Sequence, residues 1–202
     1  MTGLDPTEGE PNARPVLSGA AGASCLEPSA WHLTGERGFQ AGHRQMLERS
    51  FRLPDGAEHT YTLRADGDSV CVLALTARHQ VVLARQFRPG PKLILDELPG
   101  GYLAPNEDPV TAGLRELAEE TGYFGSGELV GSAWHCAYST TRRHVILVRQ
   151  AEPGLATADP SEPVQVVLRN LDEFRQQALA GQLTNVDGAL LALATLGTPI
   201  AT

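Results

Sequence analysis

The sequence contains few cysteines, and their spacing does not suggest disulfide bonds. It contains three cysteines, Cys25, Cys71 and Cys136, in 202 residues, and no two of them form a close pair. This odd, scattered set argues against a disulfide framework and against a zinc site of the cysteine type. Cys71 lies inside an apolar run, so we expect it to be a small core residue and not a nucleophile.

Long apolar runs and an excess of basic charge are also missing. No apolar run reaches the roughly 18–20 residues that cross a bilayer. The N-terminus lacks the basic start and apolar stretch of a signal peptide, so we expect a cytoplasmic protein with no membrane partner. Sixteen basic against 24 acidic residues give a net charge of −8, which disfavours nucleic acid as a partner. Small phosphorylated ligands stay possible, because a bound divalent cation reverses the local charge.

The length of the chain suits one domain preceded by a tail. Residues 1–30 are rich in Gly, Pro, Ala and Ser and have no periodic apolar pattern, which predicts a disordered tail. Residues 31–202 then form the domain. Short apolar and β-branched segments within it predict strands, namely 46–53, 59–64, 70–76, 80–87, 93–98, 144–148 and 164–168. Closing helices are predicted at 171–180 and 184–196, and this order of elements is typical of a layered, mixed α/β domain.

The clearest predicted helix lies between Asp108 and Gly122. Asp108 is a favourable N-cap, Pro109 suits the first helical position, and Gly122 suits the C-terminal cap. Side chains at three- and four-residue spacing predict the inward face, namely Val110, Leu114, Leu117 and Thr121.

The outward face of this helix carries three glutamates, Glu116, Glu119 and Glu120. Residues three and four positions apart are neighbours on a helix, so these carboxylates converge and repel one another. The C-terminal half of a helix is also the unfavourable end for negative charge. One arginine, Arg115, does not neutralise the cluster. Such a stretch is either an ordinary solvated acidic face or a site for a hard cation such as Mg²⁺ or Mn²⁺.

The wider pattern resembles the Nudix box. Gly101 is followed after five residues by Glu107, and after seven more by the sequence RELAEETG at 115–122, which matches every fixed polar and glycine position. Tyr123 stands where the family usually has a large aliphatic residue. The resemblance implies an α/β fold, an α/β/α sandwich with a mixed sheet, in which the box forms a loop–helix–loop. It further implies hydrolysis of a nucleoside diphosphate linked to another group, with Mg²⁺ or Mn²⁺ as cofactor.

The resemblance also implies roles for individual residues. By their positions in the box, Glu116, Glu119 and Glu120 would be metal ligands, and Glu119 is alternatively the base for the attacking water. The carbonyl of Gly100, just before the box, would be a further ligand. Arg115 would orient the glutamates, with Glu107 supporting the loop. Glu162 stands in an acidic loop where related enzymes carry a catalytic glutamate, and it is a second candidate base unless it is simply solvated.

Two further stretches resemble the ADP-ribose pyrophosphatase branch, QVVLARQFR at 80–88 and ELPGG at 97–101. By that likeness Arg85 and Arg88 would contact phosphate, and Glu97 would complete the metal or substrate site; the alternative is strand-edge charges in water. The implied reaction splits ADP-ribose or a related nucleotide sugar into AMP and a sugar phosphate. The branch commonly forms homodimers with a shared site, to which residues 31–63 would contribute.

The stretch 137–144 departs from that branch. Tyr138 stands where ADP-ribose members often have proline, and a tyrosine there is typical of members that act on dinucleoside polyphosphates. Tyr138 could stack on a base and Arg143 or Arg142 pair with phosphate, or the tyrosine could simply be packed beside a solvated turn. Two alternatives therefore stay open: hydrolysis of dinucleoside polyphosphates or nucleoside triphosphates, and a nucleotide-sensing module without catalysis. The three intact glutamates argue against the sensor.

Overall fold

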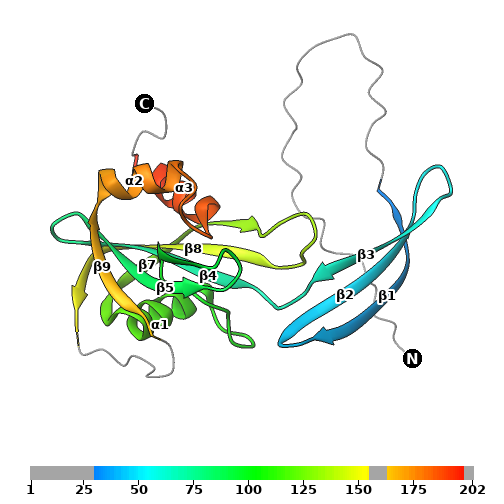
Figure 1. Ribbon diagram of the computed structural model, residues 1–202, viewed down its shortest axis with the longest axis horizontal. Coiled ribbons are helices and arrows are strands. Elements are labelled where there is room, and N and C mark those ends of the chain that lie inside the picture. The colour runs from blue at the N-terminus through cyan, green and yellow to red at the C-terminus, as the bar shows by residue number, and fades with distance from the viewer. Residues whose placement is uncertain (1–29, 155–162, 198–202) are drawn as a thin grey trace, which may run out of the picture.

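A computed structural model describes residues 30–154 and 163–197 of the chain (Figure 1). The predicted tail, except residue 30, and the candidate base Glu162 lie outside these residues. The elements in chain order are β1 (His32–Ala41), β2 (Arg44–Arg52), β3 (Glu58–Arg64), β4 (Ser69–Thr76), β5 (Gln80–Arg88), β6 (Leu93–Glu97), α1 (Pro109–Thr121), β7 (Tyr123–Trp134), β8 (Arg142–Pro153), β9 (Gln165–Asn170), α2 (Leu171–Leu179) and α3 (Val186–Thr195). None of the helices described is long and apolar enough to cross a membrane.

The strands form two sheets. The main sheet has the order β6-β5-β4-β8-β7, with β9 paired to β5, and it is mixed because β4 and β8 run parallel while its other pairs are antiparallel. Strands β1, β2 and β3 form a separate antiparallel sheet, which we call the outer sheet. Figure 1 shows the outer sheet to one side of the layered body.

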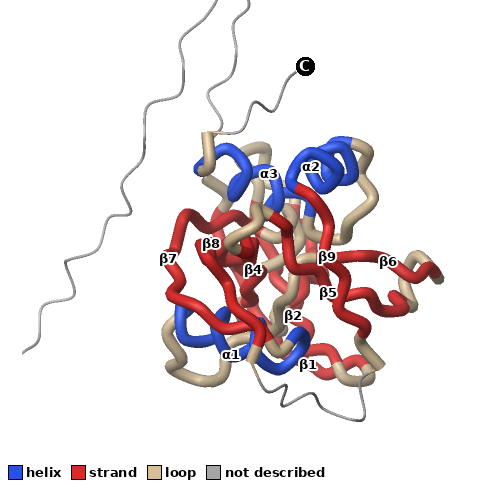
Figure 2. Tube along the Cα trace, turned by 90° about the vertical axis from the view of Figure 1, so that its left-hand side faces the viewer, coloured by secondary structure: helices blue, strands red, loops and turns tan. Residues whose placement is uncertain are grey.

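Strand β4 lies in the middle of the main sheet and is buried on both faces. Its residues Cys71 and Leu73 point into the core beneath α2 and α3, whereas Val72 and Ala74 point into the core beneath α1. A strand covered on both faces reads as a continuous apolar run, which is how 70–76 reads in the sequence. The predicted α/β/α sandwich with a mixed sheet is therefore confirmed (Figure 2).

Helix α1 begins and ends where the sequence predicts. Oδ2 of Asp108 accepts hydrogen bonds from the backbone amides of Val110 and Thr111 at 3.0 and 3.1 Å, which caps the helix. Gly122 has a φ of 67°, the left-handed conformation that favours glycine at a helix end. Leu117 is fully buried, so the opposite face of the helix, with its glutamates, is turned outward.

Two strands were not predicted. Strand β1 is exposed along almost its whole length, so it has no alternating apolar pattern to reveal it. Strand β7 is interrupted by glycines at positions where a side chain would clash: a Cβ on Gly127 would lie 2.9 Å from Ile146 and one on Gly131 would lie 2.5 Å from Leu191. Close packing selects glycine there and hides the strand pattern.

Candidate active site

Arg115 connects the acidic residues at the outward face of α1. Its Nη1 donates to Oε1 of Glu116 at 2.8 Å and to Oε2 of Glu119 at 3.0 Å. Its Nε and Nη2 donate to the two oxygens of Glu107 at 2.9 and 3.0 Å. Arg115 thus links the loop before α1 to two glutamates of the helix.

The fork between Arg115 and Glu107 is a strong ion pair, because a guanidinium matches a carboxylate with two parallel hydrogen bonds. Hydrogen bonds from Arg115, and a further one from the amide of Ala104, lower the pKa of Glu107 to about 2. Glu107 is therefore ionised at any ordinary pH and is occupied by Arg115, which suits a supporting residue.

Glu120 points away from Arg115, toward the turn that precedes the box. Its Oε2 accepts a hydrogen bond from the amide of Gly100 at 3.0 Å, and its Oε1 lies 3.4 Å from Nε2 of Gln86. Burial raises the pKa of Glu120 to about 7, and burial likewise raises that of Glu116. These two carboxylates are costly to keep charged without a counter-charge.

Backbone geometry presents Gly100 to the helix. The carbonyls of Pro99 and Gly101, on either side, accept hydrogen bonds from Val72 and Val70 of strand β4 at 2.9 and 2.8 Å. Successive carbonyls alternate in extended chain. The carbonyl of Gly100 therefore faces away from β4, on the side of its own amide and of Glu120, and no backbone partner for it occurs among the described residues.

Gly101 makes room for Glu116. A Cβ built on Gly101 would lie 2.4 Å from Oε1 of Glu116, closer than any real contact. A side chain at this position would push the carboxylate out of place, so the box glycine acts by close approach.

Carboxylate oxygens are still available for a cation. Arg115 uses one oxygen of Glu116 and one of Glu119, which leaves the other oxygen of each. Within the described part of the chain, no three carboxylate, imidazole or thiol groups already converge on one point as metal ligands do. The arrangement is therefore a cluster of hard oxygen donors. Two of these donors belong to Glu116 and Glu119, which Arg115 also contacts.

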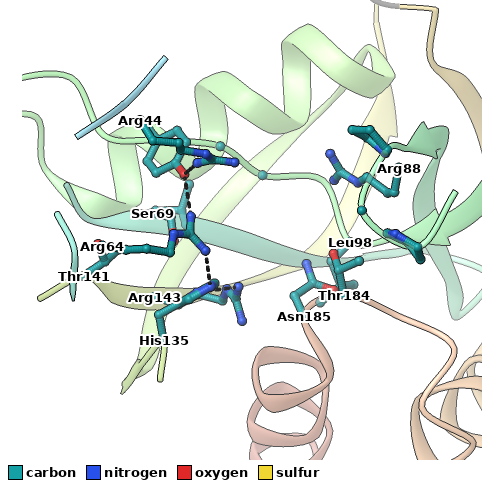
Figure 3. A pocket seen from close by; sticks show the side chains of 17 residues that line it. Arg44, Arg64, Ser69, Arg88, Leu98, His135, Thr141, Arg143, Thr184 and Asn185 are labelled. Carbon is teal, nitrogen blue, oxygen red and sulfur yellow. Dashed lines mark hydrogen bonds between the residues drawn. The ribbon is translucent and has the colours of Figure 1, made fainter. Parts of the chain in front are cut away.

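Two adjoining cavities open around Gly100 and Gly101. The first, of about 590 Å³, is lined by Gln86, Arg88, Glu116 and Glu120 among others, and we call it the glutamate cavity. The second, of about 530 Å³, is lined by four arginines and a histidine among others, and we call it the arginine cavity (Figure 3). Both are lined by Arg88, Gly100, Gly101 and Tyr102, so they adjoin at these residues.

Arg88 is placed by a buried carboxylate. Its Nε donates to Oε2 of Glu97, whose side chain has no exposed surface. The other oxygen of Glu97 accepts a hydrogen bond from the amide of Thr184 at 2.7 Å. Arg88 lines both cavities, as expected of a phosphate contact, whereas Glu97 reaches them only through Arg88.

Arg85 and Tyr138 are not brought to this site. Arg85 donates to both oxygens of Asp96, at 2.5 and 2.9 Å, and it lines neither cavity. Tyr138 is 57% exposed and packs beside Tyr61 of the outer sheet, with ring centroids 6.2 Å apart. Arg143, by contrast, lines the arginine cavity together with His135.

Three residues at the site were missed in the sequence. Arg44 and Arg64 of the outer sheet line the arginine cavity, and Tyr102 joins them, accepting hydrogen bonds at 2.5 and 3.2 Å. Arg44 and Arg64 lie far from the box in sequence, and they share no spacing with it. Only the docking of the outer sheet brings them to Gly100, so no local pattern could have revealed them.

The chain matches a protein-family model. The model described as "NUDIX domain" matches residues 65–188, which is more than half of the chain. The matched segment begins directly after the outer sheet and contains the glutamate helix.

Similar proteins agree with that match over parts of their length. A methanol dehydrogenase activator of Bacillus methanolicus is 29% identical over 61% of this chain and 69% of its own. An ADP-ribose pyrophosphatase of Bacillus subtilis is 37% identical over 35% of this chain, but the matched part is only 38% of that enzyme. A crystal structure described as an ADP compounds hydrolase superimposes with a TM-score of 0.68 over 85% of this chain and 98% of its own. At 16% identity this likeness shows the fold alone.

Proposed function

The chain belongs to the Nudix family of hydrolases, and on that premise we propose that it cleaves the diphosphate bond of ADP-ribose or a related nucleoside diphosphate sugar. The products would be AMP and a sugar phosphate. The observation that carries the proposal is the pairing of Glu120 with the amide of Gly100, both of which line a 590 Å³ cavity. The Bacillus subtilis relative, named as an ADP-ribose pyrophosphatase, supports the choice of substrate.

The residues present fit a Mg²⁺ or Mn²⁺ ion. Glu116, Glu119 and Glu120 would hold it through carboxylate oxygens, and Gly100 through its carbonyl, all of them hard donors. The raised pKa values of Glu116 and Glu120 support this, since a cation is the counter-charge that these buried carboxylates lack. When bound, the ion would neutralise charge on the phosphoryl oxygens and make a water molecule more acidic.

The remaining tasks are phosphate binding and proton transfer, for which the chain offers Arg88 and two glutamates. Arg88, held by Glu97, is positioned to donate to a phosphate oxygen. Glu119 is 45% exposed at the edge of the cluster and is the candidate to accept a proton from the attacking water. Glu162 remains the second candidate for that step.

A second substrate class has one observation in its favour. The arginine cavity adjoins the glutamate cavity, and a dinucleoside polyphosphate or nucleoside triphosphate would place additional phosphates there. Tyr138, the original reason for considering this class, contacts the outer sheet and lines neither cavity. The support for this alternative therefore comes from the arginines of the arginine cavity and not from Tyr138.

We also propose that two copies of the chain associate through the outer sheet. Trp31, Phe51 and Tyr61 form an aromatic cluster there, with centroids 5.7–6.2 Å apart, and Trp31 is 45% exposed. A surface cluster of aromatic rings is typical of protein interfaces. Measuring the molar mass by light scattering tests this, and a monomer at micromolar concentration would contradict it.

Product analysis tests the reaction. Purified protein is incubated with Mg²⁺ and a panel of nucleotides, and the products are separated by ion-exchange chromatography. We expect AMP and ribose 5-phosphate from ADP-ribose. Nucleotide binding without turnover of any member of the panel would favour a sensor and contradict the proposal.

A further inference from the structure

Tyr102, the residue after the box glycine, makes polar contacts with two separate parts of the molecule. Its carbonyl accepts a hydrogen bond from Nη2 of Arg115 at 3.2 Å. Its ring hydroxyl accepts hydrogen bonds from Nη1 of Arg44 at 2.5 Å and from Nη2 of Arg64 at 3.2 Å. Arg115 belongs to helix α1, whereas Arg44 and Arg64 belong to the outer sheet. Tyr102 thus joins the outer sheet to the arginine of the glutamate cluster.

The backbone on either side of Tyr102 is fixed to strand β4. The carbonyl of Gly101 accepts the amide of Val70 at 2.8 Å, and the amide of Leu103 donates to the carbonyl of Asp68 at 3.0 Å. Backbone groups of successive residues alternate in direction in extended chain, so the carbonyl of Tyr102 faces away from β4 and toward α1. Tyr102 itself is therefore held by side chains of α1 and of the outer sheet.

The two outer-sheet arginines are oriented by a shared carboxylate. Both donate to Oδ2 of Asp66, at 3.0 Å from Arg44 and 3.1 Å from Arg64. Oδ1 of Asp66 accepts the amide of Gln45 at 2.9 Å, and the Asp66 side chain is only 7% exposed. Figure 3 shows both arginines at the arginine cavity. Because the guanidinium groups are already ordered, they lose little further freedom when they donate to the hydroxyl of Tyr102.

Backbone hydrogen bonds fix Arg64 relative to the main sheet. Its amide donates to the carbonyl of Tyr138, and its carbonyl accepts the amide of Thr140, both at 2.9 Å. Tyr138 and Thr140 belong to the segment between β7 and β8. The guanidinium of Arg64 therefore reaches Tyr102 from a strand whose end is anchored to the main sheet. The contact with the hydroxyl depends on how the outer sheet is docked.

A displacement of Tyr102 would reach the glutamate cluster by two routes. Gly101, the preceding residue, packs so closely against Glu116 that a Cβ on it would lie 2.4 Å from Oε1. Arg115, which donates to the carbonyl of Tyr102, also donates to Glu116 at 2.8 Å and to Glu119 at 3.0 Å. The placement of both carboxylates therefore depends on groups that contact Tyr102 or adjoin it in the chain.

From these contacts we infer that Tyr102 is a positioning residue for the reaction. Its hydroxyl allows the outer sheet to hold the box loop in the position in which Glu116 and the carbonyl of Gly100 bind the same cation. The inference rests on the proposed function in one respect, namely that these groups hold the metal. The outer sheet then acts on the reaction without contacting the reacting atoms, and its docking is a condition for full activity.

The substitution Tyr102→Phe tests this role, because it removes the hydroxyl and keeps the ring that lines both cavities. We expect kcat with ADP-ribose to fall about 10-fold, since hydrogen bonds to charged groups are strong, while KM stays within about two-fold. The Mg²⁺ concentration that gives half the maximal rise in melting temperature should increase about five-fold or more. An unchanged kcat and Mg²⁺ response would overturn the inference. A loss confined to KM would also overturn it, because the hydroxyl would then contact the substrate.

Replacing the two arginines tests whether the outer sheet acts through the hydroxyl. Arg44→Gln and Arg64→Gln should each weaken the Mg²⁺ response. In a protein that carries both substitutions, Tyr102→Phe should have little additional effect. The Mg²⁺ response is measured without substrate, so any contact of these arginines with a nucleotide does not enter the comparison. Strictly additive effects would overturn the inference.

Two control variants match these changes. Arg37→Gln removes an arginine from the same outer sheet, where Arg37 is exposed, pairs with Glu48 at 2.7 Å and lines neither cavity. Tyr123→Phe removes a tyrosine hydroxyl from a residue that lines neither cavity. We expect both controls to keep the kcat, KM and Mg²⁺ response of the wild-type protein. A loss in the controls equal to that in Tyr102→Phe would overturn the inference.

Hydrogen exchange in metal-free protein separates this inference from the proposed function. We expect the amides of Gly100 and Leu103 to exchange about 10-fold faster in Tyr102→Phe than in the wild-type protein. Unchanged exchange overturns the inference, whatever the reaction. Faster exchange with an unchanged Mg²⁺ response and kcat also overturns it, because the loop is then held without positioning the site. If exchange responds but the wild-type protein neither binds Mg²⁺ nor turns over a nucleotide, the proposed function fails and the positioning role fails with it.

Discussion

The amide of Gly100 donates a 3.0 Å hydrogen bond to Oε2 of Glu120, so the turn before the box and the last glutamate of α1 fix each other. If either residue moved, the carboxylate of Glu120 and the carbonyl of Gly100 would no longer be placed to bind the same cation. The bond keeps a half-buried carboxylate next to the carbonyl of Gly100, which has no backbone partner within residues 30–154 and 163–197, with Glu116 one turn away along the helix. Several consequences of this arrangement are open to measurement.

The first prediction concerns stability against pH in metal-free protein. The pKa of Glu120 is raised from its ordinary value of 4.5 to about 7, so the folded state binds a proton more tightly than the unfolded chain does. The protonated carboxyl of Glu120 stabilises the fold fully below about pH 4.5. This contribution is lost as the pH rises through about 7. Glu120→Gln should therefore raise the free energy of unfolding by about 2 kcal/mol at pH 8.

This pH dependence provides its own control. At pH 4.5 and below the wild-type carboxyl is protonated and resembles glutamine, so the two proteins should melt together. At pH 8 the variant should melt roughly 4–8 °C higher. Thermal denaturation in EDTA, followed by circular dichroism, measures both, and an equal difference at the two pH values would contradict the raised pKa.

The second prediction concerns the metal. Mg²⁺ that binds only the folded protein should raise its melting temperature, by an amount that grows with concentration. Glu116→Gln and Glu120→Gln should lose most of this rise, and kcat with ADP-ribose should fall by at least about 100-fold. Glu128→Gln, on the exposed part of β7, is the control and should keep both properties. A full Mg²⁺ response in both site variants would exclude these carboxylates as ligands.

The third prediction tests the close approach at Gly101. The Cβ of Gly101→Ala would lie 2.4 Å from Oε1 of Glu116, so the carboxylate must be displaced. We expect kcat to fall by about 10-fold or more, since misplacing a catalytic group by about 1 Å is costly. Gly38→Ala is the control, because its Cβ would meet nothing closer than 4.0 Å. Equal activity of the two alanine variants would contradict the crowding argument.

The fourth prediction concerns Arg88 and Glu97. Glu97 has no exposed side-chain surface, so Arg88→Met leaves a buried carboxylate without its partner and should destabilise the fold by about 2–3 kcal/mol. Adding Glu97→Gln should recover part of the loss, because the amide oxygen still accepts the hydrogen bond from Thr184. Urea denaturation of the two single variants and the double variant measures the coupling. Strictly additive effects would mean that the pair does not act as a unit.

Helix α1 could be predicted from the sequence because its determinants are local. Asp108 caps it, Gly122 ends it, and the three glutamates are neighbours by helical geometry alone. The central strand β4 was also evident, since burial on both faces produces an unbroken apolar run.

Interactions between distant segments could not be predicted in this way. Arg64 and His135 are 71 residues apart in the sequence. They meet only because the outer sheet packs against the residues that follow the end of β7. Tyr138 was predicted either to stack on a base or to be packed, and only the fold shows that its ring lies beside Tyr61 of the outer sheet. Arg85 likewise precedes Arg88 by three residues on β5, and it is taken up by Asp96 instead.

The family match begins at residue 65, immediately after Arg64. The glutamate helix thus lies within the segment that the family model matches, whereas Arg44 and Arg64 precede it. The likeness to the ADP compounds hydrolase covers 85% of the chain and extends into the residues before 65. The arginine cavity forms where the outer sheet meets the main sheet, so a shift of the outer sheet would change the surroundings of Gly100 without any change within α1.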